Sequence, residues 1–196
     1  MSTKIIIITG LAATGKSWLA NIITEFTSLP LITKDDLKIE LFSSLGTKDR
    51  AWDRSLGITA LNLQRLILEK MLEKRVSIIV ESNYLDQYDG DRFRSLAKSF
   101  DVEFLQIVLG TNGETLIERY TKRALRGEKH PFFNEQNNIE EFRERLRPGF
   151  VDPMDLPGKV IKVDTTDFAK VNIQELKKKI ALFLKSDKYD NAIINI

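Results

Sequence analysis

Residues 5–18 read Ile-Ile-Ile-Ile-Thr-Gly-Leu-Ala-Ala-Thr-Gly-Lys-Ser-Trp, and this stretch decides the fold. Its glycines at 10 and 15 are followed by Lys16 and Ser17, which fits the spacing G-x-x-x-x-G-K-[ST]. The four isoleucines before the loop are typical of a buried parallel strand. Apolar residues at helical spacing follow the loop, as far as Phe26. The stretch therefore predicts a strand, a phosphate-binding loop and a helix, rather than a glycine turn before an ordinary helix.

Each fixed position of this loop has a physical role. Glycines adopt backbone angles that residues with a Cβ avoid, so the loop can turn its N–H groups inward around a phosphate chain. The motif assigns the Lys16 ammonium to the β- and γ-phosphates and the Ser17 hydroxyl to Mg²⁺. The Trp18 ring is expected to pack rather than to serve as a platform for a ligand. The residues expected to bind the nucleotide are Gly10, Leu11, Ala12, Ala13, Thr14, Gly15, Lys16, Ser17 and Trp18.

The composition excludes several kinds of site. The 196 residues contain no cysteine and one histidine, His130, which excludes disulfides, thiolate ligands, a cysteine nucleophile and a multi-histidine metal site within one chain. The length favours a single domain, and a net charge of +2 is too small to argue by itself for nucleic acid or an acidic membrane. No signal-peptide pattern and no membrane-spanning stretch is present. We therefore expect a cytoplasmic enzyme without a membrane partner, and the sequence predicts no oligomeric state.

Strand and helix patterns alternate along the chain. Buried-strand patterns occur at about 4–9, 29–33, 76–80, 101–109 and 160–163, and helical patterns at about 16–26, 34–42, 51–74, 89–100, 113–125, 139–146 and 172–184. This alternation predicts an α/β fold of three layers, in which helices cover both faces of a five-stranded parallel sheet. One domain would span 1–185. The tail, 186–196, is either frayed or adds an edge strand.

Polar side chains cluster where the expected strands end. Asp35 and Asp36 follow the second strand, and Glu81-Ser-Asn83 follows the third. Open α/β sheets place their ligand sites at the carboxyl ends of the strands, so these groups are expected beside the phosphate loop. The acidic pair has a simpler explanation as well, because acidic residues also favour the first turn of a helix as caps.

An arginine stripe follows the fourth strand. Arg119, Arg123 and Arg126 recur at spacings of four and three, and residues 119–130 hold five positive charges against one negative charge. We expect this segment to form a lid over the ligand crevice, spanning about 119–147.

Together, these motifs resemble those of small P-loop kinases. The set is similar to the kinase domain of polynucleotide 5′-kinases and to a broader group of uncharacterised ATPase-like kinases, and more distantly to zeta toxins and chloramphenicol phosphotransferases. The resemblance covers about 1–185 and implies a kinase-type P-loop NTPase fold with a helical lid, ATP as phosphoryl donor and Mg²⁺ as cofactor. The motifs that carry it are Gly10–Ser17, Lys34-Asp-Asp-Leu-Lys38, Glu81-Ser-Asn83, Arg119-Tyr-Thr-Lys-Arg123 and Asp164-Thr-Thr-Asp167.

The resemblance implies how the acceptor is bound. Asp35 matches the aspartate that activates the acceptor hydroxyl, and Asp36 is the competing candidate one residue further on. Lys38 stands where polynucleotide kinases carry a substrate-binding arginine, and a lysine weakens bidentate phosphate recognition. Ser82-Asn83 matches a Thr-Asn pair, so Asn83 joins Asp35 and Lys38 as an expected substrate-binding residue.

The resemblance also implies how the nucleotide and the metal are held. Arg119 and Arg123 match lid arginines that touch ATP phosphates, and the segment Asp164–Phe168 sits where related kinases hold the adenine. Glu81 replaces the aspartate that is commoner at this strand end. It would join Ser17 in the Mg²⁺ site by holding a metal-bound water, or would only cap the sheet. The expected catalytic residues are Lys16, Asp35 and Arg123.

Three functions fit these observations. The first is an ATP-dependent kinase that transfers the γ-phosphoryl group to a hydroxyl of a small molecule. The second is a polynucleotide kinase that binds a nucleic acid 5′-hydroxyl end, although backbone recognition usually needs a stronger basic footprint. The third is a nucleotide-driven switch or assembly ATPase, which would need a residue that positions water. The sequence instead offers an acid beside the second strand, which suits deprotonation of a hydroxyl and favours a kinase.

Overall fold

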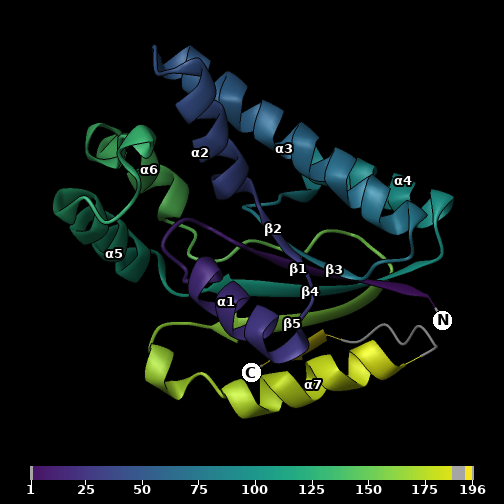
Figure 1. Cartoon of the computed structure of the whole chain (residues 1–196). Helices are drawn as coiled ribbons and strands as arrows, with labels where there is room; N and C mark the ends of the chain where they lie inside the picture. Colours follow the sequence, from purple (N-terminus) through teal and green to yellow (C-terminus); the bar gives the residue numbers. More distant parts are fainter. Residues whose placement is uncertain (1, 187–192, 196) are drawn as a thin grey trace.

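A computed structural model describes residues 2–186 and 193–195 of the chain, and a six-stranded sheet forms its centre (Figure 1). The strand order is β2-β3-β1-β4-β5-β6, and every neighbouring pair is parallel. The expected α/β fold and its five strands are confirmed, and the sheet gains one short edge strand. The strands are β1 (Thr3–Gly10), β2 (Leu31–Thr33), β3 (Ile78–Glu81), β4 (Val102–Gly110), β5 (Gly158–Asp164) and β6 (Ile193–Asn195).

Helices cover both faces of this sheet, as the alternation of strands and helices predicts (Figure 1). Side chains alternate across a strand, so Ile6 and Ile8 of β1 pack with α1 and α7 on one face. Ile5 and Ile7 pack with α3 and α4 on the other face. The helices are α1 (Lys16–Thr27), α2 (Lys34–Leu45), α3 (Arg50–Glu73), α4 (Asp91–Ser99), α5 (Gly113–Arg126), α6 (Ile139–Leu146) and α7 (Ile173–Lys185).

Four single-turn segments connect these elements: η1 (Asp86–Gly90), η2 (Pro131–Phe133), η3 (Glu135–Asn138) and η4 (Phe168–Lys170). Within the part of the chain that the structure describes, no helix is both long and apolar enough to cross a membrane. Of the expected tail, 187–192 and 196 lie outside the described residues. Residues 193–195 pair with β5, which is the edge-strand alternative for this part of the tail.

A third apolar cluster joins α5 and α6 to the phosphate loop. Tyr120 of α5 stacks on Phe142 of α6, with ring centroids 4.7 Å apart. Loop residues 11–13 pack against the same cluster. The two helices form a separate group beside the sheet (Figure 1). The segment that carries the arginine stripe is therefore seated directly on the loop expected to bind phosphate.

Candidate active site

The phosphate loop needs its two glycines for different reasons. Gly10 has φ +148°, and a Cβ there would lie 2.3 Å from the Leu109 carbonyl oxygen of the neighbouring strand. Gly15 has φ +91°, and a Cβ there would lie 2.5 Å from the Phe168 ring. The buried Thr14 hydroxyl donates a hydrogen bond of 2.9 Å to the Leu11 carbonyl and so closes the loop on itself. The turn thus depends on the absence of side chains where β4 and η4 approach it.

Lys16 of the phosphate loop lies close enough to Glu81, at the end of β3, for each to shift the pKa of the other. The Lys16 ammonium donates to the Leu11 carbonyl oxygen at 2.9 Å. Burial lowers the pKa of Lys16, while the nearby Glu81 and Asp35 carboxylates act in the opposite direction. Glu81 ends β3 and is 4% exposed, and burial raises its pKa against the pull of Lys16. The two groups therefore influence one another's charge at the carboxyl end of the sheet.

Ser17 and Glu81 are compatible with a magnesium site. The Ser17 hydroxyl donates to Glu81 Oε2 at 3.3 Å, so two oxygen ligands lie together at the start of α1. The described residues hold no group of three or more acidic or histidine side chains around a common point. A site of this kind suits Mg²⁺, which keeps several waters and binds through one or two protein oxygens plus substrate phosphates. When bound, the metal would neutralise charge on those phosphates.

The structure separates the two aspartates that follow β2. Asp36 is exposed, and its backbone N–H donates to the Thr33 hydroxyl that caps α2. Asp35 is half-buried, and its Oδ2 lies 2.7 Å from the Lys129 ammonium. Burial alone would raise the pKa of the Asp35 carboxyl, but Lys129, with Lys34 and Lys16, holds that pKa below its ordinary value. Asp35 is therefore the aspartate that faces the charged centre.

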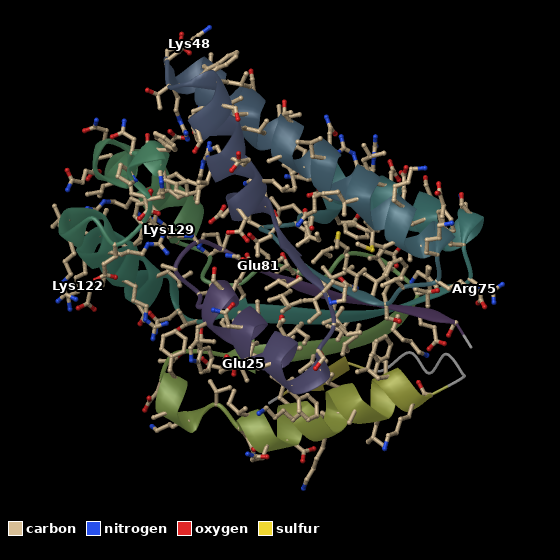
Figure 2. All side chains as sticks on the ribbon, viewed as in Figure 1. Glu25, Lys48, Arg75, Glu81, Lys122 and Lys129 are labelled. Atoms are coloured by element: carbon tan, nitrogen blue, oxygen red, sulfur yellow. The ribbon has the colours of Figure 1, made fainter. Side chains whose placement is uncertain are left out.

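Lys129 is a site residue that the sequence analysis did not single out. It counts there only as one of five lid cations. It belongs to the lid and lies close enough to Glu81, at the end of β3, to lower the pKa of that carboxyl (Figure 2). Its ammonium bridges the lid to α2 through Asp35. The Phe132 ring of η2 packs on Phe42 of α2 at 5.2 Å and anchors the same loop. The only signal in the sequence is the local excess of positive charge.

Two further lysines line the α2 side. Lys34 donates to Asn83 Oδ1 at 3.1 Å, which ties the start of α2 to the residues after β3. Lys38 is buried, and its ammonium lies 2.5 Å from Asp53 Oδ1 of α3. The first contact thus links Asn83 to Lys34, the residue that precedes Asp35 in the sequence. The chain turns Lys38 toward α3, and acceptor binding by Lys38 remains a prediction.

The arginine stripe splits between two environments. Arg123 donates from two nitrogens to the Glu135 carboxylate of η3, so it is held within the lid. Arg119 lies over the Phe168 ring at 4.5 Å and donates to the Thr166 carbonyl at 3.0 Å. Trp18 meets the same Phe168 ring edge-on, with centroids 5.0 Å apart. The Arg119 end of the stripe therefore lies at the segment after β5, where the resemblance expects the adenine.

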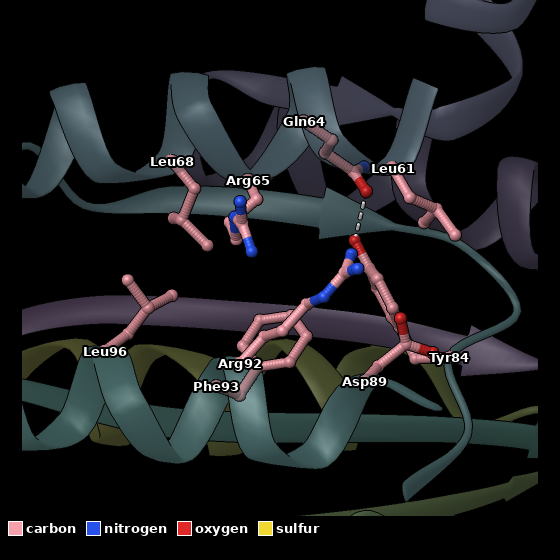
Figure 3. A pocket seen from close by; sticks show the side chains of 9 residues that line it. All are labelled: Leu61, Gln64, Arg65, Leu68, Tyr84, Asp89, Arg92, Phe93 and Leu96. Atoms are coloured by element: carbon pink, nitrogen blue, oxygen red, sulfur yellow. Dashed lines mark hydrogen bonds between the residues drawn. The ribbon is translucent and has the colours of Figure 1, made fainter. Parts of the chain in front are cut away.

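A buried glutamine fixes the two strand ends that carry Asp35 and Glu81. The Gln64 amide of α3 donates to the carbonyl oxygens of Ile32 at 2.7 Å and of Glu81 at 3.2 Å. Its carbonyl accepts from the Tyr84 hydroxyl, at the wall of a small pocket between α3 and α4 (Figure 3). Glu81 is not among the residues that line this pocket. Nothing in the sequence distinguishes Gln64 from the other residues of a long amphipathic helix.

Comparison with known proteins identifies the family and the fold of the chain. The family model described as an AAA domain matches residues 5–148. The chain belongs to this family. A protein from Chloroflexus aurantiacus, provisionally assigned as a kinase, is 31% identical with a TM-score of 0.84, and the match covers 96% of this chain and 100% of that one. The fold of the chain is that of small P-loop kinases.

More distant structures share the fold only. A sugar kinase from Janibacter is 16% identical with a TM-score of 0.52, over 94% of this chain and 95% of that one. A chain of the Pnkp1/Rnl/Hen1 RNA repair complex is 13% identical with a TM-score of 0.51, over 100% of this chain and 79% of that one. A comparison with curated proteins finds no match.

Proposed function

We propose that this protein is an ATP-dependent kinase that transfers the γ-phosphoryl group to a hydroxyl of a small molecule. One observation carries the proposal. The Asp35 carboxylate stands after β2, close enough to Lys16 of the phosphate loop for each to shift the other's pKa. A hydroxyl placed between these two groups has a proton acceptor on one side and the γ-phosphate on the other. Kinases need this arrangement, because their catalysis consists mostly of positioning and charge stabilisation.

The chemical step assigns a part to each group. The acceptor oxygen attacks the γ-phosphorus, its proton passes to Asp35, and the bond from the γ-phosphorus to the bridging oxygen breaks, so that ADP leaves with the electron pair. Lys16 holds the β- and γ-phosphates, and Ser17 with Glu81 holds the Mg²⁺ site. Once the Arg123 guanidinium has left the Glu135 carboxylate, this guanidinium stabilises the charge that develops on the transferred phosphoryl group. Arg119 acts at the base end of the nucleotide as well as near the phosphates.

The sequence also supports our proposals for the bounds of the domain and its lid and for the cellular location. The lid comprises about 119–147 of a domain that spans about 1–185. The absence of cysteine fits a reducing compartment, and we assign the protein to the cytoplasm. The likeness to the Chloroflexus protein supports phosphoryl transfer as the activity class.

ADP release tests the function directly. The purified chain is given ATP and Mg²⁺ with a panel of small hydroxyl compounds, with a 5′-hydroxyl oligonucleotide, or with no acceptor. We expect acceleration by a small compound, and no acceleration in the Lys16→Ala variant. Acceleration by the oligonucleotide alone would make the protein a polynucleotide kinase instead. An acceptor-independent rate that no compound changes would support the ATPase alternative.

A further inference from the structure

Within the part of the chain that the structure describes, Lys34 differs from the other acceptor-side cations in forming no ion pair. Lys38 is paired with Asp53, Arg123 with Glu135 and Lys129 with Asp35. Lys34 makes no ion pair with any described carboxylate, and its ammonium donates to the neutral Asn83 amide. An ammonium has three N–H donors, so donors remain after this hydrogen bond is made.

The position of Lys34 disfavours the charged form of its side chain. It is the first residue of α2, where the helix dipole favours anions and disfavours cations. Burial lowers the pKa of Lys34, and only the nearby Asp35 and other carboxylates counteract this effect. The Asn83 amide is a neutral partner, so this hydrogen bond leaves the charge of Lys34 unneutralised. An anion bound at this point would be attracted both by the ammonium and by the helix end.

Lys129 supplies a second cation beside Asp35, with its ammonium 2.7 Å from Asp35 Oδ2. It comes from the lid, whereas Lys34 comes from the start of α2, and both influence the Asp35 carboxyl. An acceptor hydroxyl that donates to Asp35 would share this carboxylate with the Lys129 ammonium, which contacts it in the structure. Lys129 then has donors available for another anionic oxygen.

We propose that the acceptor is a small hydroxylated anion, whose charged group lies between Lys34 and Lys129 while its hydroxyl lies on Asp35. This proposal rests on the proposed kinase function. The anionic group is a carboxylate or a phosphate monoester, because either offers the oxygens that two ammonium groups can bind. It stays unchanged through the reaction, in which a hydroxyl oxygen forms the new bond to phosphorus and Asp35 receives the proton.

Matched pairs of acceptors test the proposal. Glycerol is compared with glycerate and glycerol 3-phosphate, glucose with gluconate, and ribose with ribose 5-phosphate, by ADP release at fixed ATP and Mg²⁺. We expect acceleration by anionic members only, and the carboxylate and phosphate arms identify which anion is bound. Faster turnover of the neutral members would overturn the proposal, as would no acceleration by any anionic member. In that last case, Lys16-dependent ATP binding would leave the phosphate-loop assignment intact.

Variants of Lys34 separate charge from structure. In Lys34→Met, KM for an active anionic acceptor should rise about 10- to 100-fold, the loss expected for a hydrogen bond to a charged group. KM for ATP should stay within twofold, and Lys34→Arg should recover most of the affinity. Lys70→Met, which removes an exposed lysine on α3, is the matched control. Unchanged acceptor KM in a folded Lys34→Met variant would overturn the assignment of Lys34.

Discussion

The phosphate loop is built in the opposite way to the acceptor wall, the group of Lys34, Asp35, Asn83 and Lys129 to which we assign the acceptor. The loop is local: its glycine angles, its Thr14 and Lys16 contacts and its helix end all come from nine consecutive residues, 10–18. The acceptor wall is assembled from pairs far apart in sequence, such as Lys129 with Asp35, 94 residues apart, and Lys34 with Asn83, 49 residues apart. In the proposed function, a local motif holds the phosphate, whereas pairs of residues far apart in sequence select the acceptor. The two regions should therefore respond differently to substitution.

The largest effect is expected at the loop. Lys16→Ala removes the charge on the β- and γ-phosphates, so ATP binding should weaken strongly and kcat/KM should fall at least about 10²-fold for any acceptor. Calorimetric titration with ATP measures the first quantity and ADP release the second. ATP affinity equal to that of the wild type would remove the loop from nucleotide binding.

Arg123 tests whether the lid acts in the transition state. Arg123→Ala should lower kcat by about 10²-fold with KM for ATP changed much less, because charge develops on the transferred group only during reaction. Arg126→Ala is the matched control, since this arginine is on the same stripe and its side chain is 70% exposed. Equal, small effects in both variants would show that the stripe is only surface.

Lys129 should set the acid limb of the pH profile. Asp35 must be ionised to accept a proton, and Lys129 lowers its pKa against the opposing effect of burial. Lys129→Met leaves burial less opposed, so the pKa of Asp35 rises and activity is lost at a higher pH than in the wild type. The kcat/KM profile of both proteins measures this shift. An unmoved acid limb would assign it to another group.

Lys38 should matter for stability more than for turnover. Lys38→Met leaves the Asp53 carboxylate with Arg50 as its remaining partner and should cost about 2 kcal/mol of unfolding free energy, less than the loss typical of a fully buried pair. Urea denaturation measures this, and Lys70→Met, which breaks an exposed pair, should change stability by under about 0.5 kcal/mol. A large rise in acceptor KM with unchanged stability would instead support Lys38 as a substrate-binding residue.

The same contrast explains how far the sequence could be interpreted. The four isoleucines and the glycine spacing predicted the strand, loop and helix, because periodicity and turn chemistry are local. The Asp35 and Glu81 positions followed from the rule that parallel strands end at one edge. Spacing alone could not separate Arg119 from Arg123. Their different neighbours, Phe168 and Glu135, come from segments whose paths depend on tertiary packing.

Gln64 and Lys129 are two site residues that the sequence analysis did not single out. Each contacts strand ends or helices that the chain reaches only after folding, and neither has a residue pattern that marks it. The pairing of β6 with β5 is another example, since the sequence allows either a frayed tail or an added edge strand. Contacts of this kind depend on the tertiary structure, and the spacing of residues along the sequence does not predict them.

Single-turnover phosphoryl transfer in Asp35→Asn, measured with an active acceptor, tests the central claim most directly. Asparagine keeps the shape of the side chain and cannot take the proton, so ATP should bind as in the wild type while transfer slows by about 10²- to 10⁴-fold. Asp36→Asn, at the exposed neighbour, should transfer at close to the wild-type rate. Transfer at the wild-type rate in Asp35→Asn would contradict the assignment of this aspartate as the group that activates the acceptor hydroxyl.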